Sequence, residues 1–306
     1  MQHLVAAKQL TPEILSELIQ SAEQYRQLLE SADGRKQLRE LYPDKVVATL
    51  FYEPSTRTRL SHESAAQRLG AGVVSTENAM EFSSAIKGET IEDTVRVVAG
   101  YADVIVIRHK ETGILDRAQA ASPVPVINAG DGTGEHPTQA LLDVYTIWRE
   151  MGTLEGLNIV MGGDLAHGRT VRSLAQVMAQ YKGTSFTFVS VPQLQIGEDI
   201  KALLQEKGIA FSETEDVNEA ARQADVVYWT RLQKERLEDP SVEDSFVIDE
   251  SVVANMKDKS VVMHPLPRVV EITPGVDADP RAAYFRQSHN GVYARMALLS
   301  HLFSQR

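Results

Sequence analysis

The chain has 306 residues, of which 43% are hydrophobic and 24% charged, with a formal net charge of −11 at pH 7 and no cysteine. This length predicts two domains of ordinary size, and the acidic balance argues against a phosphate-backbone-binding surface over the whole molecule. Without cysteine there can be no disulfide, thiolate nucleophile or cysteine-bound zinc, which suits a reducing compartment.

Membrane and export signals are not expected. No apolar run approaches the roughly 18–20 residues that a membrane span needs. The N-terminal "MQHLVAAKQLTPEIL" has no basic region ahead of a long apolar core, so a secretory signal is not predicted. We therefore expect a cytoplasmic protein that binds neither a membrane nor nucleic acid.

The first half of the chain alternates between helical and strand patterns. Thr11 can cap a helix that begins at Pro12, and apolar residues recur at spacings of one, three and four through residue 31. Further elements follow in chain order: a strand at 45–52, a helix at about 55–69, a strand at 71–76, a helix at 88–101, strands at 103–108 and 124–128, and a helix at 136–152.

The pattern restarts near residue 150. The predicted elements are a strand at 157–164, a helix at 169–182, a strand at 185–191, a helix at 198–208, a strand at 209–216, a helix and then a strand within 217–231, a strand and turn at 260–268, and a closing helix at 290–303. Strands that alternate with helices of this length predict an α/β protein with two domains, each a mainly parallel sheet flanked by helices.

Ligands of such sheets bind where strands end and loops turn into helices, so the first strand end is informative. In "FYEPSTRTRL" (51–60), Pro54 ends the strand, and Ser55 or Thr56 can cap the next helix. The free backbone N–H groups at that helix start form a phosphate-sized anion site with the helix dipole. The hydroxyls of Ser55, Thr56 and Thr58 add further donors.

Two arginines stand in the same stretch. Arg57 supplies a charged fork that suits phosphate. Arg59 is two positions on, about 200° around a helix, so both side chains cannot face one ligand. We assign Arg57 to the anion and Arg59 to a structural ion pair. The alternative is a well-capped helix with solvated arginines.

Two more groups follow strands of the first domain. Arg108 ends a predicted strand, where it either points into the crevice or forms an ion pair at the sheet edge. A turn with three glycines, which we expect to be flexible, leads to His136 and to Pro137, and Pro137 suits the first position of a helix. The positive end of the helix dipole would keep His136 neutral and able to donate to a carbonyl oxygen. Gln139 carries an amide that can both donate and accept hydrogen bonds. The alternative is that His136 is only a helix cap and Gln139 a surface residue.

The second domain offers matching groups. In "MHPLPR" (263–268) two prolines without N–H flank Leu266, so the carbonyl oxygens of Leu266 and Pro267 suit a ligand NH2, unless this is only a rigid turn. Arg169 begins a helix, and Arg231 and Gln233 follow a strand on one side of it. Two arginines from separate strand ends suggest a dicarboxylate, with solvated arginines as the alternative. No glycine cluster has the spacing of a dinucleotide-binding motif.

Five segments follow one another along the chain: "STRTR", "SSAIKGET", "HPTQ", "RLQKER" and "HPLPR". Together they resemble the aspartate/ornithine carbamoyltransferase family from about residue 10 to the C-terminus. They are similar to its aspartate branch. The ornithine branch usually has a cysteine in an H-C-L-P motif and an S-M-G loop, whereas this chain has Pro265, no cysteine and no S-M-G.

The resemblance implies a fold and a reaction. The expected parts are a carbamoyl-phosphate-binding domain at 1–150, an aspartate-binding domain at 151–288, and a C-terminal helix at 289–306 that packs back on the first domain. The implied reaction transfers the carbamoyl group of carbamoyl phosphate to the amine of L-aspartate, an early step of pyrimidine synthesis. It needs no metal and no organic cofactor. The alternatives are a carbamoyltransferase for another amine and a catalytically silent scaffold.

The resemblance also implies roles for individual residues. The positions that match phosphate binding are Ser55, Thr56, Arg57, Thr58 and Arg108. The positions that match polarisation of the carbamoyl carbonyl are Thr58, Arg108 and His136. The positions that match binding of the carbamoyl NH2 are Gln139 and the carbonyls of Leu266 and Pro267. The positions that match aspartate binding are Lys87, Arg169, Arg231 and Gln233. The catalytic set is Arg57, Thr58, Lys87, Arg108 and His136.

Assembly is implied in the same way. Ser83 and Lys87 match a loop that reaches the active site of the neighbouring subunit, so a homotrimer with shared sites is expected, with regulatory chains or a dihydroorotase as possible partners. Glu53 and Arg236 resemble residues that help Arg169 hold the two domains closed. One departure is His62, where the family more usually has phenylalanine; we expect it to alter packing rather than chemistry.

Overall fold

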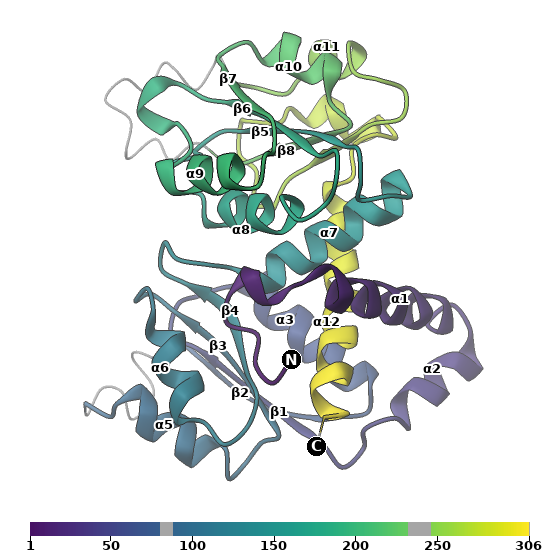
Figure 1. Cartoon of the computed structure of the whole chain (residues 1–306). Helices are drawn as coiled ribbons and strands as arrows, with labels where there is room; N and C mark the ends of the chain where they lie inside the picture. Colours follow the sequence, from purple (N-terminus) through teal and green to yellow (C-terminus); the bar gives the residue numbers. More distant parts are fainter. Residues whose placement is uncertain (80–87, 232–245, 306) are drawn as a thin grey trace. The chain divides into compact units, whose positions relative to one another are not determined.

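The computed structural model describes residues 1–79, 88–231 and 246–305. They form two compact units, Met1–Leu142 with His289–Arg306, and Asp143–Ser288. The divisions fall inside two helices, α7 (Pro137–Met151) and α12 (Tyr284–Phe303) (Figure 1). Most of α12 belongs to the first unit, which confirms that the closing helix returns to the first domain. Among the described residues, no helix is both long and apolar enough to span a bilayer.

The first unit is built on a parallel sheet whose strands lie in the order β2-β1-β3-β4. The strands are β1 (Val46–Phe51), β2 (Gly72–Glu77), β3 (Val104–His109) and β4 (Val126–Asp131). The helices within this unit are α1 (Pro12–Leu28), α2 (Ala32–Arg39), α3 (Thr56–Arg68), α5 (Ile91–Val98) and α6 (Ile114–Ala121).

Helices cover both faces of this sheet. Apolar residues of α5 and α6, among them Val95 and Leu115, pack with Ile105 and Ile107 of β3 in one buried cluster. Helices α3 and α12 lie on the opposite face (Figure 1). Helix α1 begins as its sequence predicts, because Thr11 caps it by accepting a hydrogen bond from the Ile14 amide.

The second unit is built on a five-stranded parallel sheet in the order β7-β6-β5-β8-β9. The strands are β5 (Asn158–Gly162), β6 (Ser185–Val189), β7 (Phe211–Thr214), β8 (Val226–Trp229) and β9 (Val261–Met263). The helices within this unit are α8 (Arg169–Met178), α9 (Glu198–Glu206), α10 (Val217–Gln223) and α11 (Glu250–Ala254).

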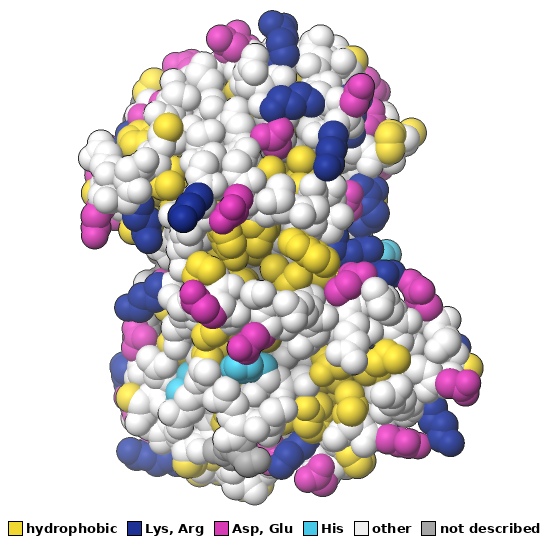
Figure 2. Space-filling view, turned by 45° about the vertical axis from the view of Figure 1, so that its right-hand side comes forward, with side chains coloured by type: hydrophobic (Ala, Val, Ile, Leu, Met, Phe, Trp, Pro, Cys, Tyr) yellow, Lys and Arg dark blue, Asp and Glu magenta, His cyan; other side chains and the backbone are white. Residues whose placement is uncertain are grey.

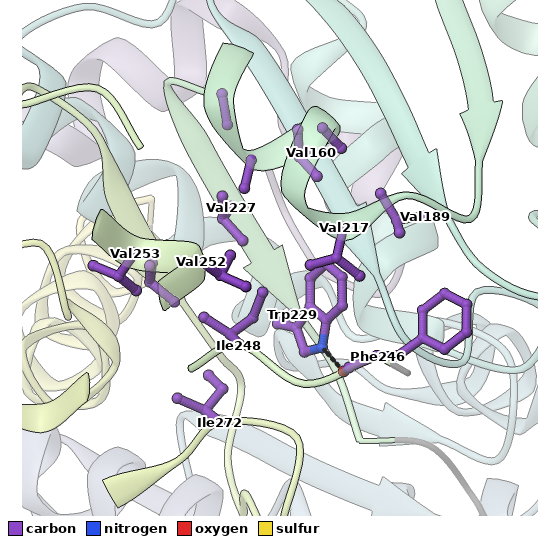
Figure 3. Packing of buried hydrophobic residues seen from close by; sticks show 14 of the residues in the cluster. Val160, Val189, Val217, Val227, Trp229, Phe246, Ile248, Val252, Val253 and Ile272 are labelled. Carbon is purple, nitrogen blue, oxygen red and sulfur yellow. Dashed lines mark hydrogen bonds between the residues drawn. The ribbon is translucent and has the colours of Figure 1, made fainter. Parts of the chain in front are cut away.

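The core on one face of the second sheet is centred on Trp229. Figure 3 shows valines of β5, β8, α10 and α11 around this ring, whose Nε1–H donates to the carbonyl oxygen of Phe246 at 2.9 Å. A Cβ atom on Gly162 of β5 would lie 2.1 Å from the Trp229 ring, so only glycine fits beside it. This close packing aligns the ends of β5 and β8, the strands that precede Arg169 and Arg231.

The predicted alternation of strands and helices is confirmed in both units, and every strand pairing is parallel. Among the described residues, the α-helices α2, α6 and α11 were not predicted. Helix α12 begins at Tyr284, earlier than the predicted residue 290.

Candidate active site

The carboxyl ends of three neighbouring strands bring the predicted residues of the first unit to one sheet edge. β1 and β3 pair in parallel with Phe51 opposite Arg108, and β3 pairs in turn with β4. The start of α3 follows β1, Arg108 lies at the end of β3, and His136 follows β4. The strand-end prediction for these residues therefore holds in the fold.

The start of α3 has the features of an anion site. Ser55 is the N-cap residue with extended backbone, but its side chain makes no capping hydrogen bond. Thr56 and Arg57 are exposed, whereas Thr58 is buried at 7% exposure. The first N–H groups of a helix have no partner within the helix and carry partial positive charge. The hydroxyl of Ser55 and these N–H groups are thus available to bind an anion.

The two arginines near the start of α3 differ as the sequence predicts. Arg59 pairs with Glu77 at 2.8 Å and with Glu63 at 3.4 Å, which confirms its structural role. No ion pair of Arg57 is found among the residues that the structure describes. Neighbouring protein atoms displace part of its hydration and lower the pKa of the Arg57 guanidinium, while much of the side chain stays exposed. Arg57 is thus an exposed cation at the start of α3, and its role in binding a ligand stays a prediction.

Arg108 lies deeper in the same edge. Its Nη2 atom is 2.7 Å from the Glu53 carboxylate, and its Nη1 donates to the carbonyl oxygen of Ala129 at 3.3 Å. The Arg108 side chain is 11% exposed, against 39% for Glu53. The ion pair and the carbonyl contact fix the direction of the guanidinium, so the edge ion pair and a binding role are compatible.

The loop between β4 and α7 is tied down rather than loose. Asp131 accepts hydrogen bonds from the Glu135 amide at 2.8 Å and from the Gly113 amide at 2.9 Å. Gly132 has a left-handed φ of 46°, and a Cβ atom there would lie 2.6 Å from the carbonyl oxygen of Lys110. The three-glycine turn predicted as flexible is therefore closely packed, which holds His136 in place.

His136 and Gln139 are both buried, at 5% and 8% exposure, so the alternative that Gln139 is a surface residue is wrong. The carbonyl oxygen of His136 accepts the amides of Gln139 and Ala140, which starts α7. The Nδ1 atom of His136 lies 3.4 Å from the hydroxyl of Thr138. The backbone of His136 thus caps the helix, and its ring is buried next to Thr138. The neutral state of the ring remains a prediction.

The second unit repeats this arrangement at its own sheet edge. Strands β5, β8 and β9 are neighbours, and each is followed by predicted binding residues. Arg169 is the first residue of α8 after β5, Arg231 follows β8 and is exposed, and Leu266 and Pro267 follow β9. The predicted residues Ser83, Lys87, Gln233 and Arg236 lie outside the described residues.

Asp164 in the β5–α8 loop was given no role from the sequence. It is 1% exposed, and its Oδ1 atom accepts the His167 amide at 3.0 Å and lies 3.1 Å from His167 Nδ1. Aspartate side chains commonly fix turns through amides further along the chain. The signal in the sequence that could have indicated this role is the position of Asp164, directly after a pair of glycines at the end of a strand.

The turn after β9 has an unusual backbone. Leu266 has a φ of 51°, in the left-handed region that non-glycine residues rarely adopt, and the Leu266–Pro267 peptide bond is cis. The Arg268 guanidinium pairs with Asp277 and lies 4.9 Å from the centre of the Tyr284 ring. Arg268 therefore anchors the far end of the turn.

His62, the departure from the family pattern, is fully buried on α3. Its Nδ1 atom lies 2.8 Å from the carbonyl oxygen of Thr58 and 3.2 Å from Nε of Arg295 on α12. Burial, and then the charge of Arg295, lower the pKa of His62 well below 6.5. A neutral ring therefore packs beneath the first turn of α3.

Two observations concern other kinds of site. In the described ranges, no group of three His, Asp or Glu side chains could hold a metal ion. On the face shown in Figure 2, basic and acidic side chains are interspersed without a continuous basic area. The residues gathered at the two sheet edges suit small anionic ligands: an anion with a carbonyl group for the first unit, and carboxylates for the second.

Comparison with known families agrees with this division. Residues 2–149 match the family described as aspartate/ornithine carbamoyltransferase, carbamoyl-P binding domain. Residues 155–302 match aspartate/ornithine carbamoyltransferase, Asp/Orn binding domain.

Individual relatives are similar over almost the whole chain. The chloroplastic aspartate carbamoyltransferase of Arabidopsis thaliana is 49% identical, covering 98% of this chain and 77% of that protein. The catalytic subunit of M. jannaschii aspartate transcarbamoylase has a TM-score of 0.93 and 43% identity, covering 100% and 99% of the two chains. Trypanosoma cruzi aspartate transcarbamoylase in complex with N-(phosphonacetyl)-L-aspartic acid has a TM-score of 0.90 and 36% identity, covering 98% and 95%.

Proposed function

The chain belongs to the aspartate/ornithine carbamoyltransferase family, and we propose that it carbamoylates L-aspartate in pyrimidine synthesis. Carbamoyl phosphate and L-aspartate give N-carbamoyl-L-aspartate and phosphate. The observation that carries this proposal is the edge of the first unit, where the open start of α3 and an exposed Arg57 stand beside Arg108 and His136. The identity to relatives named aspartate carbamoyltransferase or aspartate transcarbamoylase supports the choice of amine.

The chemistry requires orientation and charge stabilisation rather than an enzyme nucleophile. The amine nitrogen of aspartate attacks the carbonyl carbon of carbamoyl phosphate, the carbon–oxygen bond to phosphate breaks, and the phosphate leaves with the amine proton. The oxyanion of the tetrahedral intermediate is stabilised by Thr58, Arg108 and His136. A donor of this kind is typically worth about 2.7–4 kcal/mol in the transition state. The buried or partly buried positions of these three residues strengthen their hydrogen bonds.

The phosphate is assigned to Ser55, Thr56, Thr58, Arg57 and Arg108. Arginine forks and helix N-termini are the groups that proteins use most readily for phosphate. The carbamoyl NH2 is assigned to the Gln139 side chain and to the carbonyl oxygens of Leu266 and Pro267, because carbonyl oxygens accept the hydrogen bonds that an NH2 group donates.

Aspartate is assigned to Arg169 and Arg231, with Lys87 and Gln233 as further contacts from outside the described residues. L-Aspartate carries two carboxylates at neutral pH, which matches two arginines at neighbouring strand ends. L-Ornithine would present an ammonium group there, and like charges disfavour it.

The assembly proposed is a homotrimer in which Ser83 and Lys87 reach a neighbouring site. The expected test mixes Arg57→Ala chains with Lys87→Ala chains, because a shared site would be intact in some mixed trimers. Recovered activity supports sharing, and mixtures as inactive as both parents count against it. Regulatory chains are a further proposal, supported by the name of the M. jannaschii relative as a catalytic subunit. A cytoplasmic location and a dihydroorotase partner remain predictions.

The reaction is tested with the purified protein, carbamoyl phosphate and L-aspartate. We expect one phosphate released for each N-carbamoyl-L-aspartate formed, as measured by phosphate assay and mass spectrometry, and inhibition by N-(phosphonacetyl)-L-aspartate. Phosphate release without carbamoylated product, or no turnover, would contradict the proposal.

A further inference from the structure

A buried His–Glu pair lies behind the turn at 265–268. His264 follows β9 directly, and its Nε2 atom is 2.8 Å from Oε1 of Glu271; both side chains are buried. The amide of Leu266 donates to His264 Nδ1 at 2.8 Å. Because a backbone N–H can only donate, Nδ1 must accept, and the ring proton is on Nε2 and points at Glu271. The pair therefore sets both the tautomer and the direction of the ring.

The second oxygen of Glu271 closes the turn from its other end. Oε2 accepts the amides of Val269 at 3.0 Å and Val270 at 3.1 Å. Burial by itself would raise the pKa of Glu271, but the hydrogen bonds from His264 and from the backbone outweigh it, so the pKa is lowered. An ionised Glu271 thus holds one end of the turn directly and the other through His264.

These contacts explain how Leu266 keeps its left-handed backbone. A non-glycine residue at φ 51° is unfavourable by itself and persists where surrounding contacts determine it. The Leu266 amide is held by His264, and Pro265 and Pro267 have no N–H, so these three residues leave no spare donor to compete for the adjacent carbonyl oxygens.

The backbone of His264 is fixed in turn by a chain of buried polar groups in the second unit. Gln287 Oε1 accepts the His264 amide at 2.8 Å, and Gln287 Nε2 donates to Asp143 at 2.7 Å. The Tyr228 hydroxyl donates to the other Asp143 oxygen at 2.8 Å. Networks in which every member is paired hold one arrangement rigidly. The turn is therefore preorganised before any ligand arrives.

We propose that His264 and Glu271 are positioning residues for the carbonyl oxygens of Leu266 and Pro267, and so for recognition of the NH2 group of the carbamoyl donor. The inference rests on the proposed function, which assigns those carbonyls to that NH2. Neither side chain touches the substrate. If the turn is displaced, the carbonyl oxygens of Leu266 and Pro267 move together. The affinity for the NH2 group then falls, whereas the phosphate contacts of the first unit are unchanged.

The test compares three ligands that share phosphate and differ at the NH2 group: carbamoyl phosphate, acetyl phosphate with a methyl group in that place, and inorganic phosphate. In Glu271→Gln, we expect the dissociation constant of carbamoyl phosphate to rise about tenfold and those of the other two to change less than about twofold. Glu250→Gln is the matched control, since Glu250 contacts Thr273 and not the turn. It should match the wild type for all three ligands.

Two substitutions at His264 separate positioning from stability. His264→Asn keeps an oxygen near the Nδ1 position for the Leu266 amide, whereas His264→Gln places its amide near Nε2 and leaves that N–H unpaired. We expect carbamoyl phosphate to bind better to His264→Asn than to His264→Gln, with similar phosphate binding.

Three results would overturn the proposal. The first is an equal loss of affinity for all three ligands in Glu271→Gln, and the second is an equal effect of the two His264 substitutions on the binding of carbamoyl phosphate. The third is a wild type that binds acetyl phosphate as tightly as carbamoyl phosphate. Failure of the proposed function looks different. In that case the wild type would not carbamoylate aspartate, although its ligand selectivity could still be measured.

Discussion

Removal of the Arg57 guanidinium is expected to abolish most of the binding of carbamoyl phosphate. Arg57 lies in the first turn of α3, is exposed, and makes no ion pair with the described carboxylates. Two charge-assisted hydrogen bonds to phosphate, at about 1.5–2 kcal/mol each, predict a loss of about a hundredfold to a thousandfold in kcat/KM for carbamoyl phosphate in Arg57→Ala.

Arg59→Ala is the matched control on the same helix. The Arg59 guanidinium is engaged by Glu63 and Glu77, and the Glu77 side chain is 43% exposed, so solvent screens much of this pairing. We expect a loss of about 0.5–1 kcal/mol in the free energy of unfolding and a change in kcat/KM of less than about threefold. Phosphate release at saturating aspartate and urea unfolding measure the two quantities. Equal kinetic losses in both variants would refute the division of roles.

Three further changes test other parts of the structure. As pH falls below 6.5, the unfolded chain protonates at His62 but the folded chain does not, so stability should fall by up to about 1.4 kcal/mol per pH unit. In urea titrations His62→Phe should flatten this slope; an unchanged slope contradicts the buried neutral ring. Arg231→Ala should raise KM for L-aspartate about tenfold to a hundredfold and leave KM for carbamoyl phosphate within about threefold; equal effects on both would count against its assignment. Gly132→Ala should cost about 1–3 kcal/mol of stability, and more than Gly113→Ala, because both glycines have positive φ but only Gly132 would bring a Cβ atom against backbone. Equal losses in thermal unfolding would refute that difference.

Much of the fold could be predicted from the sequence because its strands are apolar runs with clear ends. Strand β1 is buried along almost its whole length, and so are β4 and β5. Helix α2 was missed because it is short and polar, with only Gly34 and Leu38 buried. Its position follows from packing rather than from an apolar stripe. Helix α6 could have been inferred, since two parallel strands such as β3 and β4 need a crossover.

The candidate site was predictable to the extent that it follows strand ends. Arg57, Arg108 and His136 share one edge because parallel neighbours end on the same side. The contact between His264 and Glu271 could not be predicted in this way. It depends on the path of a turn with a left-handed residue, which no periodicity records.

The same limit applies to Arg108 and Glu53. They come from different strand ends, and only the register of β1 against β3 places their side chains at 2.7 Å. A single sequence contains the residues but not the register.

The central claim, an anion site in the first unit that serves carbamoyl transfer to aspartate, is tested most directly by comparing kcat/KM for L-aspartate and for L-ornithine in the wild type and in Arg57→Ala. The account predicts turnover with L-aspartate alone, and its near-complete loss in Arg57→Ala. Turnover with L-ornithine, or full activity of Arg57→Ala, would contradict it.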